Sequence, residues 1–300
     1  MSLCSACPRH CRRDRARETG YCGSPEAIRI ARSALHFWEE PCISGIRGSG
    51  TIFFTGCNLR CRFCQNYDIS ADASAGHEVS AEGLEDVFSA LIEAGAHNIN
   101  LVTPSHYLNS LLPVLSARRW PVPIIWNSSA YESPEELKKL EGLVDVYLPD
   151  YKYAESALAA SLSAAPDYPE TALEAIREMY RQTGPCRYDD DGMIRSGTVI
   201  RHLILPGHTR NSIAALRRLH DAFGTELPVS LMAQYTPCGD LRDYPELQRR
   251  ITERELSKVE EVLFELGFDG FLQEREAADK AFIPAFETSN GHNNSTEDRS

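Results

Sequence analysis

The sequence predicts an α/β protein built on a parallel barrel, complete or partial, with a small cysteine-rich segment in front of it. From Ser80 onward, short apolar strand patterns alternate with amphipathic helix patterns, which is typical of a parallel sheet with crossover helices. Polar residues follow the strand patterns, at the strand ends where α/β barrels carry their working side chains. Seven of the ten cysteines fall into two groups ahead of this alternation.

The barrel strands are expected where apolar and β-branched residues form short runs between turn signals. These runs cover residues 51–55, 98–102, 122–126, 144–148, 199–205 and 229–232, with a last short strand near Phe271. Between them, apolar residues spaced three and four apart predict amphipathic helices. The helices are carried by Leu84–Ile92, Leu108–Leu115, Leu173–Tyr180, Leu216–Phe223 and Leu256–Leu266, with one more after Ser133.

Capping residues predict where several of these helices begin and end. Ser133 with Glu136, and Thr252 with Glu255, match the capping box, in which each side chain bonds to the other residue's backbone N–H. Asn211 is expected to cap the helix that follows it. The glycines expected to end helices are Gly95, Gly142 and Gly184.

Composition is that of a soluble globular protein, with 42% hydrophobic and 25% charged residues. No apolar run approaches the roughly 18 residues of a membrane span, and Met1–Cys4 lacks the charged-then-apolar order of a signal peptide. We therefore expect a cytoplasmic protein, where disulfides are rare and cysteines act as metal ligands, catalytic groups or buried residues. The net charge of −12 argues against nucleic acid or an anionic membrane as partner.

The chain is expected to divide into a cysteine-rich segment at residues 1–45, a barrel at 46–284 and a disordered, polar tail at 285–300. Beside the first cysteines lies a cluster of arginines: Arg9, Arg12, Arg13, Arg15 and Arg17. This cluster is either a partner-binding patch or a solvated surface, and the second interpretation is favoured.

The strongest motif follows the strand at residues 51–55, which runs into Gly56 and then into Cys57-x3-Cys61-x2-Cys64. Three thiolates suit an iron–sulfur cluster that normally takes four, so that one iron stays open for a substrate. The alternative is a buried helix stripe, because the three positions also share one helix face. Polar residues between the cysteines, among them Asn58, would be excluded from such a stripe. The motif therefore favours a cluster.

A second group, Cys4-x2-Cys7-x3-Cys11-x10-Cys22, lies in a segment with almost no aliphatic residues. Metal binding can supply the folding free energy that such a segment lacks. Four thiols predict a closed site, either zinc or a second iron–sulfur cluster, and the alternative is four unligated surface cysteines. We expect this site to be separable from the barrel, because its ligands precede the first barrel strand. Cys42 fits either cysteine group or neither.

Polar residues at the predicted strand ends form the remaining candidate site. They are Thr103, Ser105 and His106; Asn127, Ser128 and Ser129; Asp150, Tyr151 and Lys152; Arg201 and His208; and Gln234 and Tyr235. Some of them have a structural alternative. Thr103, Ser105, Asn127 and Ser129 precede helices and fit helix caps. Asp150 and Lys152 fit an exposed ion pair, which stabilises little.

The motif Cys57-x3-Cys61-x-Phe63-Cys64 resembles the signature of radical S-adenosylmethionine (SAM) enzymes. The longer stretch 57–67 is similar to the branch of pyruvate formate-lyase activating enzyme. A poorly characterised subgroup of that branch is similar over residues 39–45 and 48–50 and has a comparable N-terminal cysteine array. The resemblance extends from Cys4 to about Phe271 and implies a partial (β/α)6-type TIM barrel.

The resemblance also implies roles for individual residues. Cys57, Cys61 and Cys64 would hold a 4Fe-4S cluster whose open iron binds the methionine end of SAM. The other residues implied at the cofactor are Phe63 near adenine, Asn127, Asp150, Lys152 and Arg201. One departure is that Thr103-Pro104-Ser105 stands where many relatives have Gly-Gly-Glu to receive the SAM amino group. Either Thr103 and Ser105 replace that contact with hydroxyls or SAM is seated differently.

By resemblance, the protein is an oxidoreductase that cleaves SAM reductively to a 5′-deoxyadenosyl radical and installs a glycyl radical on a partner enzyme. An electron donor such as flavodoxin or ferredoxin is implied. Two alternatives remain from the sequence. The same chemistry could act on a small molecule or peptide, or the chain could be a non-catalytic zinc or iron–sulfur protein.

Overall fold

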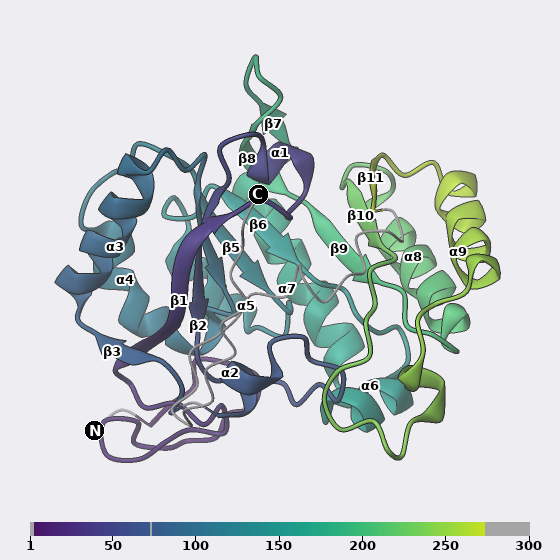
Figure 1. Cartoon of the computed structure of the whole chain (residues 1–300), viewed down its shortest axis with the longest axis horizontal. Coiled ribbons are helices and arrows are strands. Elements are labelled where there is room, and N and C mark those ends of the chain that lie inside the picture. Colours follow the sequence, from purple (N-terminus) through teal and green to yellow (C-terminus); the bar gives the residue numbers. More distant parts are fainter. Residues whose placement is uncertain (1–2, 73, 274–300) are drawn as a thin grey trace, which may run out of the picture.

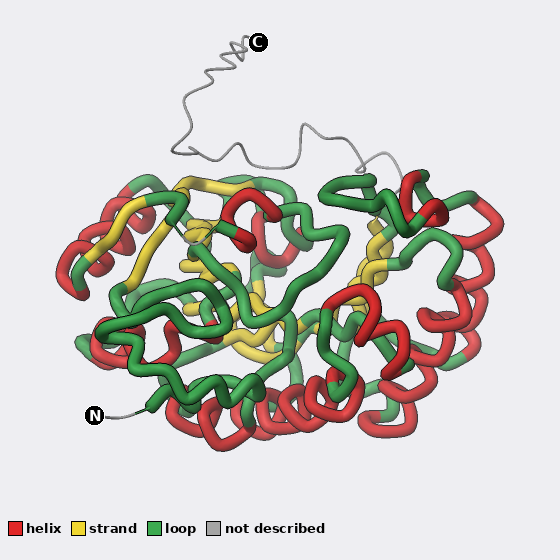
Figure 2. Tube along the Cα trace, turned by 90° about the horizontal axis from the view of Figure 1, so that it is seen from below, coloured by secondary structure: helices red, strands yellow, loops and turns green. Residues whose placement is uncertain are grey.

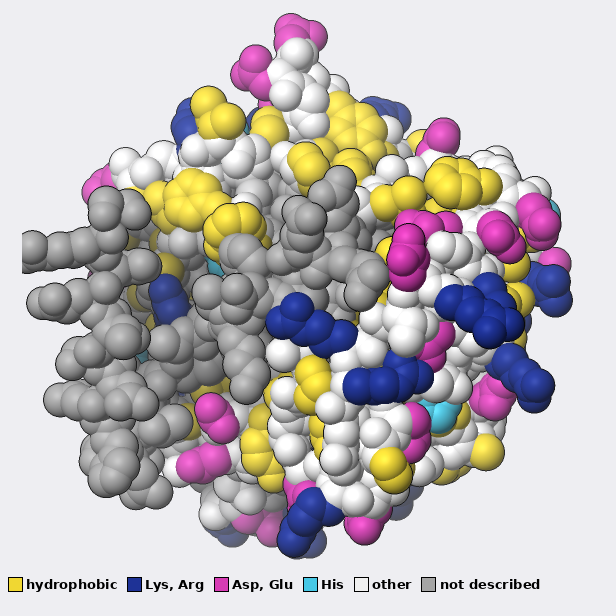
Figure 3. Space-filling model, turned by 45° about the vertical axis from the view of Figure 1, so that its right-hand side comes forward, with side chains coloured by type: hydrophobic (Ala, Val, Ile, Leu, Met, Phe, Trp, Pro, Cys, Tyr) yellow, Lys and Arg dark blue, Asp and Glu magenta, His cyan; other side chains and the backbone are white. Residues whose placement is uncertain are grey.

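The structure is a computed structural model that describes residues 3–72 and 74–273. The predicted tail at 285–300 and the end of the predicted barrel at 274–284 lie outside the described residues. Among the described residues, no helix combines the length and apolar character that crossing a membrane requires. On the face in Figure 3, Lys and Arg side chains lie interspersed with Asp and Glu side chains rather than gathered in one broad patch.

Four parallel strands form the centre of the larger sheet. They are β2 (Ser49–Phe54), β4 (Ile99–Val102), β5 (Ile124–Ser128) and β6 (Val146–Pro149). Each pairs with the next, and helices cross between them on the outside of the sheet (Figure 1). The first crossovers contain α3 (Ala81–Glu93), η1 (Ser105–Tyr107), α4 (Leu108–Ser116), α5 (Pro134–Leu137) and η2 (Lys138–Leu140).

The sheet then bends into a second, smaller sheet. β8 (Ile194–Thr198) pairs with β6, and the chain continues directly as β9 (Ile200–Leu203), where Arg201 forms a parallel bridge with Asp150. β9, β10 (Val229–Met232) and β11 (Gly270–Gln273) pair in parallel. The helices of this half are α6 (Ser156–Ser163), α7 (Tyr168–Thr183), α8 (Thr209–Phe223), η3 (Pro245–Gln248) and α9 (Glu253–Glu265). This curved parallel sheet covered by helices is a partial α/β barrel, as predicted.

Several elements were not predicted from the sequence. They are β1 (Ile28–His36), α1 (Pro41–Ser44), α2 (Tyr67–Ala71), β3 (His77–Val79) and β7 (Arg187–Tyr188), together with α6, β8 and η3. β1 pairs antiparallel with β2 and β3, so it falls in the predicted segment 1–45 yet belongs to the main sheet. α1 buries Cys42 and Ile43 against Ile125 and Val146. Cys42 therefore joins neither cysteine group.

Two of the predicted helix caps are wrong. The Ser133 hydroxyl donates to the Glu135 carboxylate at 2.9 Å and makes no cap bond. Asn211 lies inside α8, where its side-chain oxygen accepts from the Ala154 N–H at 2.9 Å. At Ser133 the Glu135 side chain competes for the hydroxyl, whereas Asn211 bonds to the backbone N–H of Ala154 from a position inside the helix. The capping box of Thr252 and Glu255 is confirmed at the start of α9.

Candidate functional site

The loop after β2, residues 55–66, is not helical, so the alternative of a cysteine stripe on a helix is wrong. Cys57, Cys61 and Cys64 instead line one cavity of about 240 Å³, together with Phe63. This cavity lies at the carboxyl ends of the parallel strands, as the barrel architecture predicts. The N-terminal loops, purple in Figure 1 and green beside the N mark in Figure 2, lie at the same end of the molecule.

Each of the three thiols receives a hydrogen bond from a neighbouring donor. The Leu59 N–H donates to Cys57 Sγ at 3.4 Å, the Ser163 hydroxyl to Cys61 Sγ at 3.0 Å, and the Ser70 hydroxyl to Cys64 Sγ at 3.3 Å. Burial raises the pKa of Cys57 to about 12 and that of Cys64 to about 11. Donors aimed at sulfur favour the thiolate form, which ligation by a metal would complete. The three side chains therefore fit a cluster.

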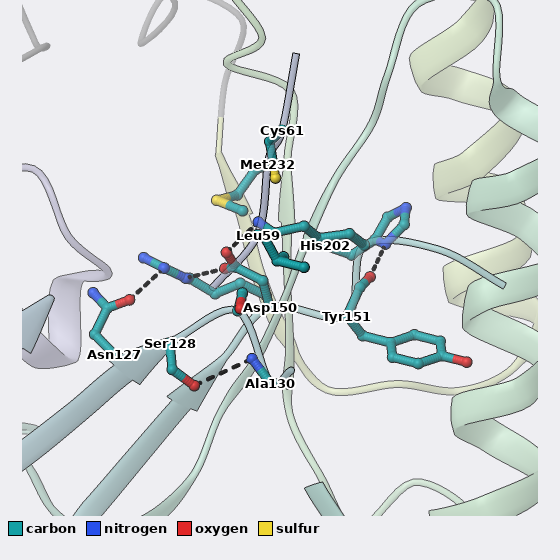
Figure 4. Close-up of polar contacts among 12 residues, drawn as sticks. Leu59, Cys61, Asn127, Ser128, Ala130, Asp150, Tyr151, His202 and Met232 are labelled. Carbon is teal, nitrogen blue, oxygen red and sulfur yellow. Dashed lines mark hydrogen bonds and ion pairs between the residues drawn. The ribbon is translucent and has the colours of Figure 1, made fainter. Parts of the chain in front are cut away.

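Charged residues meet across the same cavity at the ends of β6 and β9. Lys152 Nζ lies 2.5 Å from Asp150 Oδ2, and Arg201 Nε lies 2.9 Å from Asp150 Oδ1 (Figure 4). Burial would raise the pKa of Asp150, but Arg201 and Lys152 outweigh it and hold that pKa below its usual value. Arg201 Nη2 also donates to Asn127 Oδ1 at 2.6 Å. The predicted polar strand ends thus form one ionised, largely buried network.

Glu39 completes this network, although the sequence analysis assigned it no role. Its Oε2 lies 3.1 Å from Arg201 Nη1, and its Oε1 accepts from Asn100 Nδ2 at 3.1 Å. Glu39 comes from the loop between β1 and α1, which lines the cavity from the N-terminal side. The available signal was an acidic pair, Glu39 and Glu40, inside an apolar stretch. Burial raises the pKa of Glu40, which lies beside this network.

Thr103 and Ser105, which were predicted to act together at the cofactor, lie in different places in the structure. Thr103 lines the cavity with a φ of 61°, in the left-handed region that β-branched residues rarely adopt. Such strain is typical of backbone at ligand sites. Ser105 is buried outside the cavity lining, where its side chain bonds to the Glu132 carboxylate. The hydroxyl of Ser105 is therefore not positioned to replace the missing glutamate.

The other predicted strand-end residues fall into two sets, those that line the cavity and those that do not. Those that line the cavity are Asn127, Ser128, Ser129, Lys152 and Gln234. Tyr151 instead packs beside Tyr168, with ring centroids 6.4 Å apart. His208 lies 3.4 Å from the Glu246 carboxylate, away from the cavity lining. Phe63 packs against Tyr235 with centroids 6.1 Å apart.

The N-terminal segment packs against the loop at residues 55–66 and bonds to its backbone. The Cys57 N–H donates to the Cys22 carbonyl at 3.2 Å. Arg9 donates to the Asn58 carbonyl at 2.8 Å and to the Ala164 carbonyl at 2.6 Å. Its guanidinium also lies 4.4 Å from the centroid of the Tyr21 ring. Arg9 is therefore an internal brace.

The remaining members of the arginine cluster differ in role. Arg15 bonds to the backbone carbonyls of Ser24 and His106, so it is also internal. Arg13 instead forms an exposed pair with Glu18 at 2.8 Å. The favoured interpretation of the cluster as a solvated surface is thus wrong for Arg9 and Arg15.

Comparison with known proteins places the chain in a family. The family model described as the radical SAM superfamily matches residues 51–220, more than half of the chain. The uncharacterized protein MJ0674 of Methanocaldococcus jannaschii is 29% identical over 276 residues, which cover 89% of this chain and 75% of that protein.

Solved structures resemble the fold at low sequence identity. A radical SAM methyltransferase from Sphaerobacter thermophilus has a TM-score of 0.51 and 15% identity, and the match covers 82% of this chain and 77% of that one. Methylornithine synthase has a TM-score of 0.50 and 14% identity, with 81% and 74% covered. The chain therefore belongs to the radical SAM superfamily, whose members use a 4Fe-4S cluster and SAM for radical chemistry.

Proposed function

We propose that this radical SAM enzyme is of the activating-enzyme type and installs a glycyl radical on a partner protein. The observation that carries the proposal is the single cavity that joins the three cysteines to the charged strand ends. When bound, the cluster and SAM supply a one-electron cleavage that yields methionine and a 5′-deoxyadenosyl radical able to take a hydrogen atom. Flavodoxin or ferredoxin is the proposed electron donor.

The chain's own residues would bind and orient the cofactor. Cys57, Cys61 and Cys64 would ligate the cluster. Lys152 and Arg201 are the cations at the cavity that suit the methionine carboxylate. The carboxylates of Asp150 and Glu39 are the anions that suit the amino group and the sulfonium. This assignment would seat SAM without the Gly-Gly-Glu motif, because the anions come from other strand ends.

The strained Thr103 and the buried ring of Phe63 would shape the cavity beside the cofactor. Both residues line it. Thr103 would approach SAM through its backbone as well as its hydroxyl, because its left-handed conformation turns the chain sharply after β4. Phe63 would face the adenine, and Asn127 would hold Arg201 in place through its side-chain oxygen.

Aromatic residues at the cavity entrance support a protein substrate. Trp38 lines the cavity and is 56% exposed, and its neighbour Phe37 is 49% exposed. Aromatic side chains are enriched at protein–protein interfaces, where they contribute large contact areas. A partner's glycine loop docking here would reach the cavity between Trp38 and the cysteines. A small-molecule substrate would have less need of such a rim.

The test starts with anaerobically purified protein, SAM and dithionite. Formation of 5′-deoxyadenosine and methionine shows radical SAM activity, and iron counting separates an enzyme from a zinc protein. A candidate glycyl-radical enzyme is then added, with its glycines deuterated. Deuterium in 5′-deoxyadenosine and a glycyl-radical electron paramagnetic resonance signal would support the activating function. Cleavage of SAM without either result would reject it and leave a different substrate.

A further inference from the structure

The four N-terminal cysteines, Cys4, Cys7, Cys11 and Cys22, lie close together although they are spread over the first part of the chain. Cys7 interacts electrostatically with both Cys22 and Cys4, and Cys4 hydrogen-bonds with Cys11. A Cβ atom on Gly20 would lie 3.2 Å from Cys22 Sγ and 3.5 Å from Cys11 Sγ, so these two sulfur atoms share one side of the loop. Each thiol thus has at least one of the others as a neighbour.

The backbone of this segment presents N–H groups to sulfur in the same way as the loop at residues 55–66, which is called the catalytic loop from here on. In that loop, the N–H two residues after Cys57 and the N–H two residues after Cys64 donate to the preceding sulfur. In the N-terminal segment, the Arg9 N–H donates to Cys7 Sγ and the Arg13 N–H to Cys11 Sγ, at the same spacing. Such bonds favour the thiolate, which is the form that ligates metals.

The segment also lacks the apolar contacts that would hold it without a metal. No residue among the described positions 3–25 belongs to the apolar core clusters, and Leu3 is 56% exposed. His10 and Arg12, on either side of Cys11, have φ values of 43° and 50°. Non-glycine residues adopt this left-handed conformation only where surrounding interactions impose it. A bound metal would supply those interactions.

We propose that Cys4, Cys7, Cys11 and Cys22 ligate a second metal centre, with four thiolates and no open position. Zinc and an iron–sulfur cluster share this donor set. In the part of the chain that the structure describes, no three His, Cys, Asp or Glu residues are gathered as ligands of one ion, and this holds equally for Cys57, Cys61 and Cys64. Thiolates of a cluster bind different irons, so their sulfurs need not converge on one point, and of the two candidates an iron–sulfur cluster fits this arrangement better.

The second centre lies directly behind the catalytic loop. The Cys22 carbonyl accepts from the Cys57 N–H, and Arg60 bonds to the carbonyls of both Cys57 and Tyr21. A metal that fixes Cys22 would therefore also fix the backbone at Cys57. Its role is to hold the catalytic loop in shape, and an iron–sulfur cluster here would in addition be placed to pass electrons.

The test uses a full-length variant without the catalytic ligands, Cys57→Ala with Cys61→Ala and Cys64→Ala. Because this variant cannot hold the catalytic cluster, its metal content reports on the second centre alone, whatever the outcome of the glycyl-radical assay. After anaerobic purification it should retain either about one zinc or about four irons per chain, and Mössbauer spectra identify the second case. Adding Cys7→Ser and Cys11→Ser should remove that metal. The matched control, Cys42→Ala with Cys186→Ala, should keep it.

In the experiment with the triple variant, two results would overturn the proposal. One is a folded triple variant with no metal above background, and the other is metal that persists after Cys7→Ser and Cys11→Ser. Circular dichroism shows whether each variant folds. If the triple variant does not fold, the wild-type protein decides: it should carry metal beyond one 4Fe-4S cluster, and the Cys7→Ser, Cys11→Ser protein should lose that excess. Equal metal contents in these two proteins would also overturn it.

Discussion

The catalytic loop at residues 55–66 and the N-terminal segment at residues 3–25 use the same local chemistry in different surroundings. Both hold cysteines in turns whose N–H groups donate to sulfur. Cys57, Cys61 and Cys64 line a cavity with the charged ends of β6 and β9, whereas none of the four N-terminal cysteines lines it. Cysteine spacing therefore predicts a metal site in both regions, but only the cysteines of the loop at 55–66 line the cavity at which we propose that SAM binds.

The two regions are joined more closely than their sequence separation suggests. The sequence analysis expected a separable N-terminal site. In the structure, Gly56 packs directly against Ser24 and Cys22, and Arg9 bonds both to Asn58 in the catalytic loop and to Ala164 at the end of α6. The barrel and the segment share this junction, so changes at the junction should affect the catalytic cluster without touching its ligands.

Loss of a catalytic thiol should have the largest effect. Replacing Cys57, Cys61 or Cys64 singly by Ala should reduce reductive SAM cleavage to background, because the cluster loses one of its three protein ligands. Cleavage is measured as 5′-deoxyadenosine formed with dithionite. Cys186→Ala, a cysteine outside both groups, should keep full activity. A catalytic-cysteine variant that retains full activity would remove that residue from the ligand set.

The junction can be broken at Gly56. This residue has a φ of 78°, and an added Cβ would come within 2.1 Å of Ser24 Oγ and 2.8 Å of the Cys22 carbonyl oxygen. Gly56→Ala should lower the free energy of unfolding by about 3 kcal/mol, through strain and overpacking together, and should reduce cluster content. Urea unfolding and iron analysis measure the two effects.

Gly142 is the matched control for Gly56. Its φ is 76° and nothing lies within 4 Å of its added Cβ, so Gly142→Ala measures the conformational cost alone, about 1 kcal/mol. If both variants lose the same free energy of unfolding, the close contact between Gly56 and the N-terminal segment does not contribute to stability.

Replacing Arg9 tests the same junction from the N-terminal segment, where this side chain bonds to the barrel. Arg9→Ala removes its hydrogen bonds to the Asn58 and Ala164 carbonyls and its contact with the Tyr21 ring. We expect a loss of about 2 kcal/mol in the free energy of unfolding, because the part-buried Asn58 carbonyl loses a charged donor. Arg13→Ala removes only an exposed ion pair and should cost less than about 1 kcal/mol. Similar losses would argue that the segment is not a brace.

Lys152 should give the smallest effect, confined to the cofactor. Lys152→Ala leaves Asp150 paired with Arg201, so the fold should tolerate it. SAM affinity should fall about tenfold, equivalent to about 1.4 kcal/mol. Lys139→Ala, which breaks an exposed pair with Glu136, should leave affinity unchanged. A large loss of stability with normal SAM binding would assign Lys152 to folding.

Asp150 differs from Lys152, because the structure gives it a second role. In the sequence analysis the resemblance implied both residues at the cofactor, with an exposed ion pair as the alternative. Asp150 bonds to Lys152 and Arg201 together, so Asp150→Ala leaves two buried cations without their shared partner. We therefore expect it to weaken both SAM binding and stability, and melting temperature and equilibrium dialysis with SAM separate the two effects.

The sequence by itself determined the alternation of strands and helices, the cysteine loop after β2, the capping box of Thr252 and the polar strand ends. These features depend on residues near one another in the chain, so periodicity and spacing reveal them. β1 was missed because its strand falls within a segment that was interpreted from its cysteines alone. The Ser133 cap failed because the Glu135 side chain takes its hydroxyl, and the Asn211 cap failed because its side chain bonds to the Ala154 backbone N–H.

Only the tertiary structure decided how the site is completed. Glu39 meets Arg201 across 162 positions of sequence, and the Cys22 carbonyl meets the Cys57 N–H across the border between the segment and the barrel. No local pattern marks such contacts, because they depend on where β1 and the N-terminal segment settle against the strands. Likewise, only packing separated Thr103, which lines the cavity, from Ser105, which turns toward Glu132. Short-range preferences set the elements, while long-range contacts chose which of their polar ends face one another.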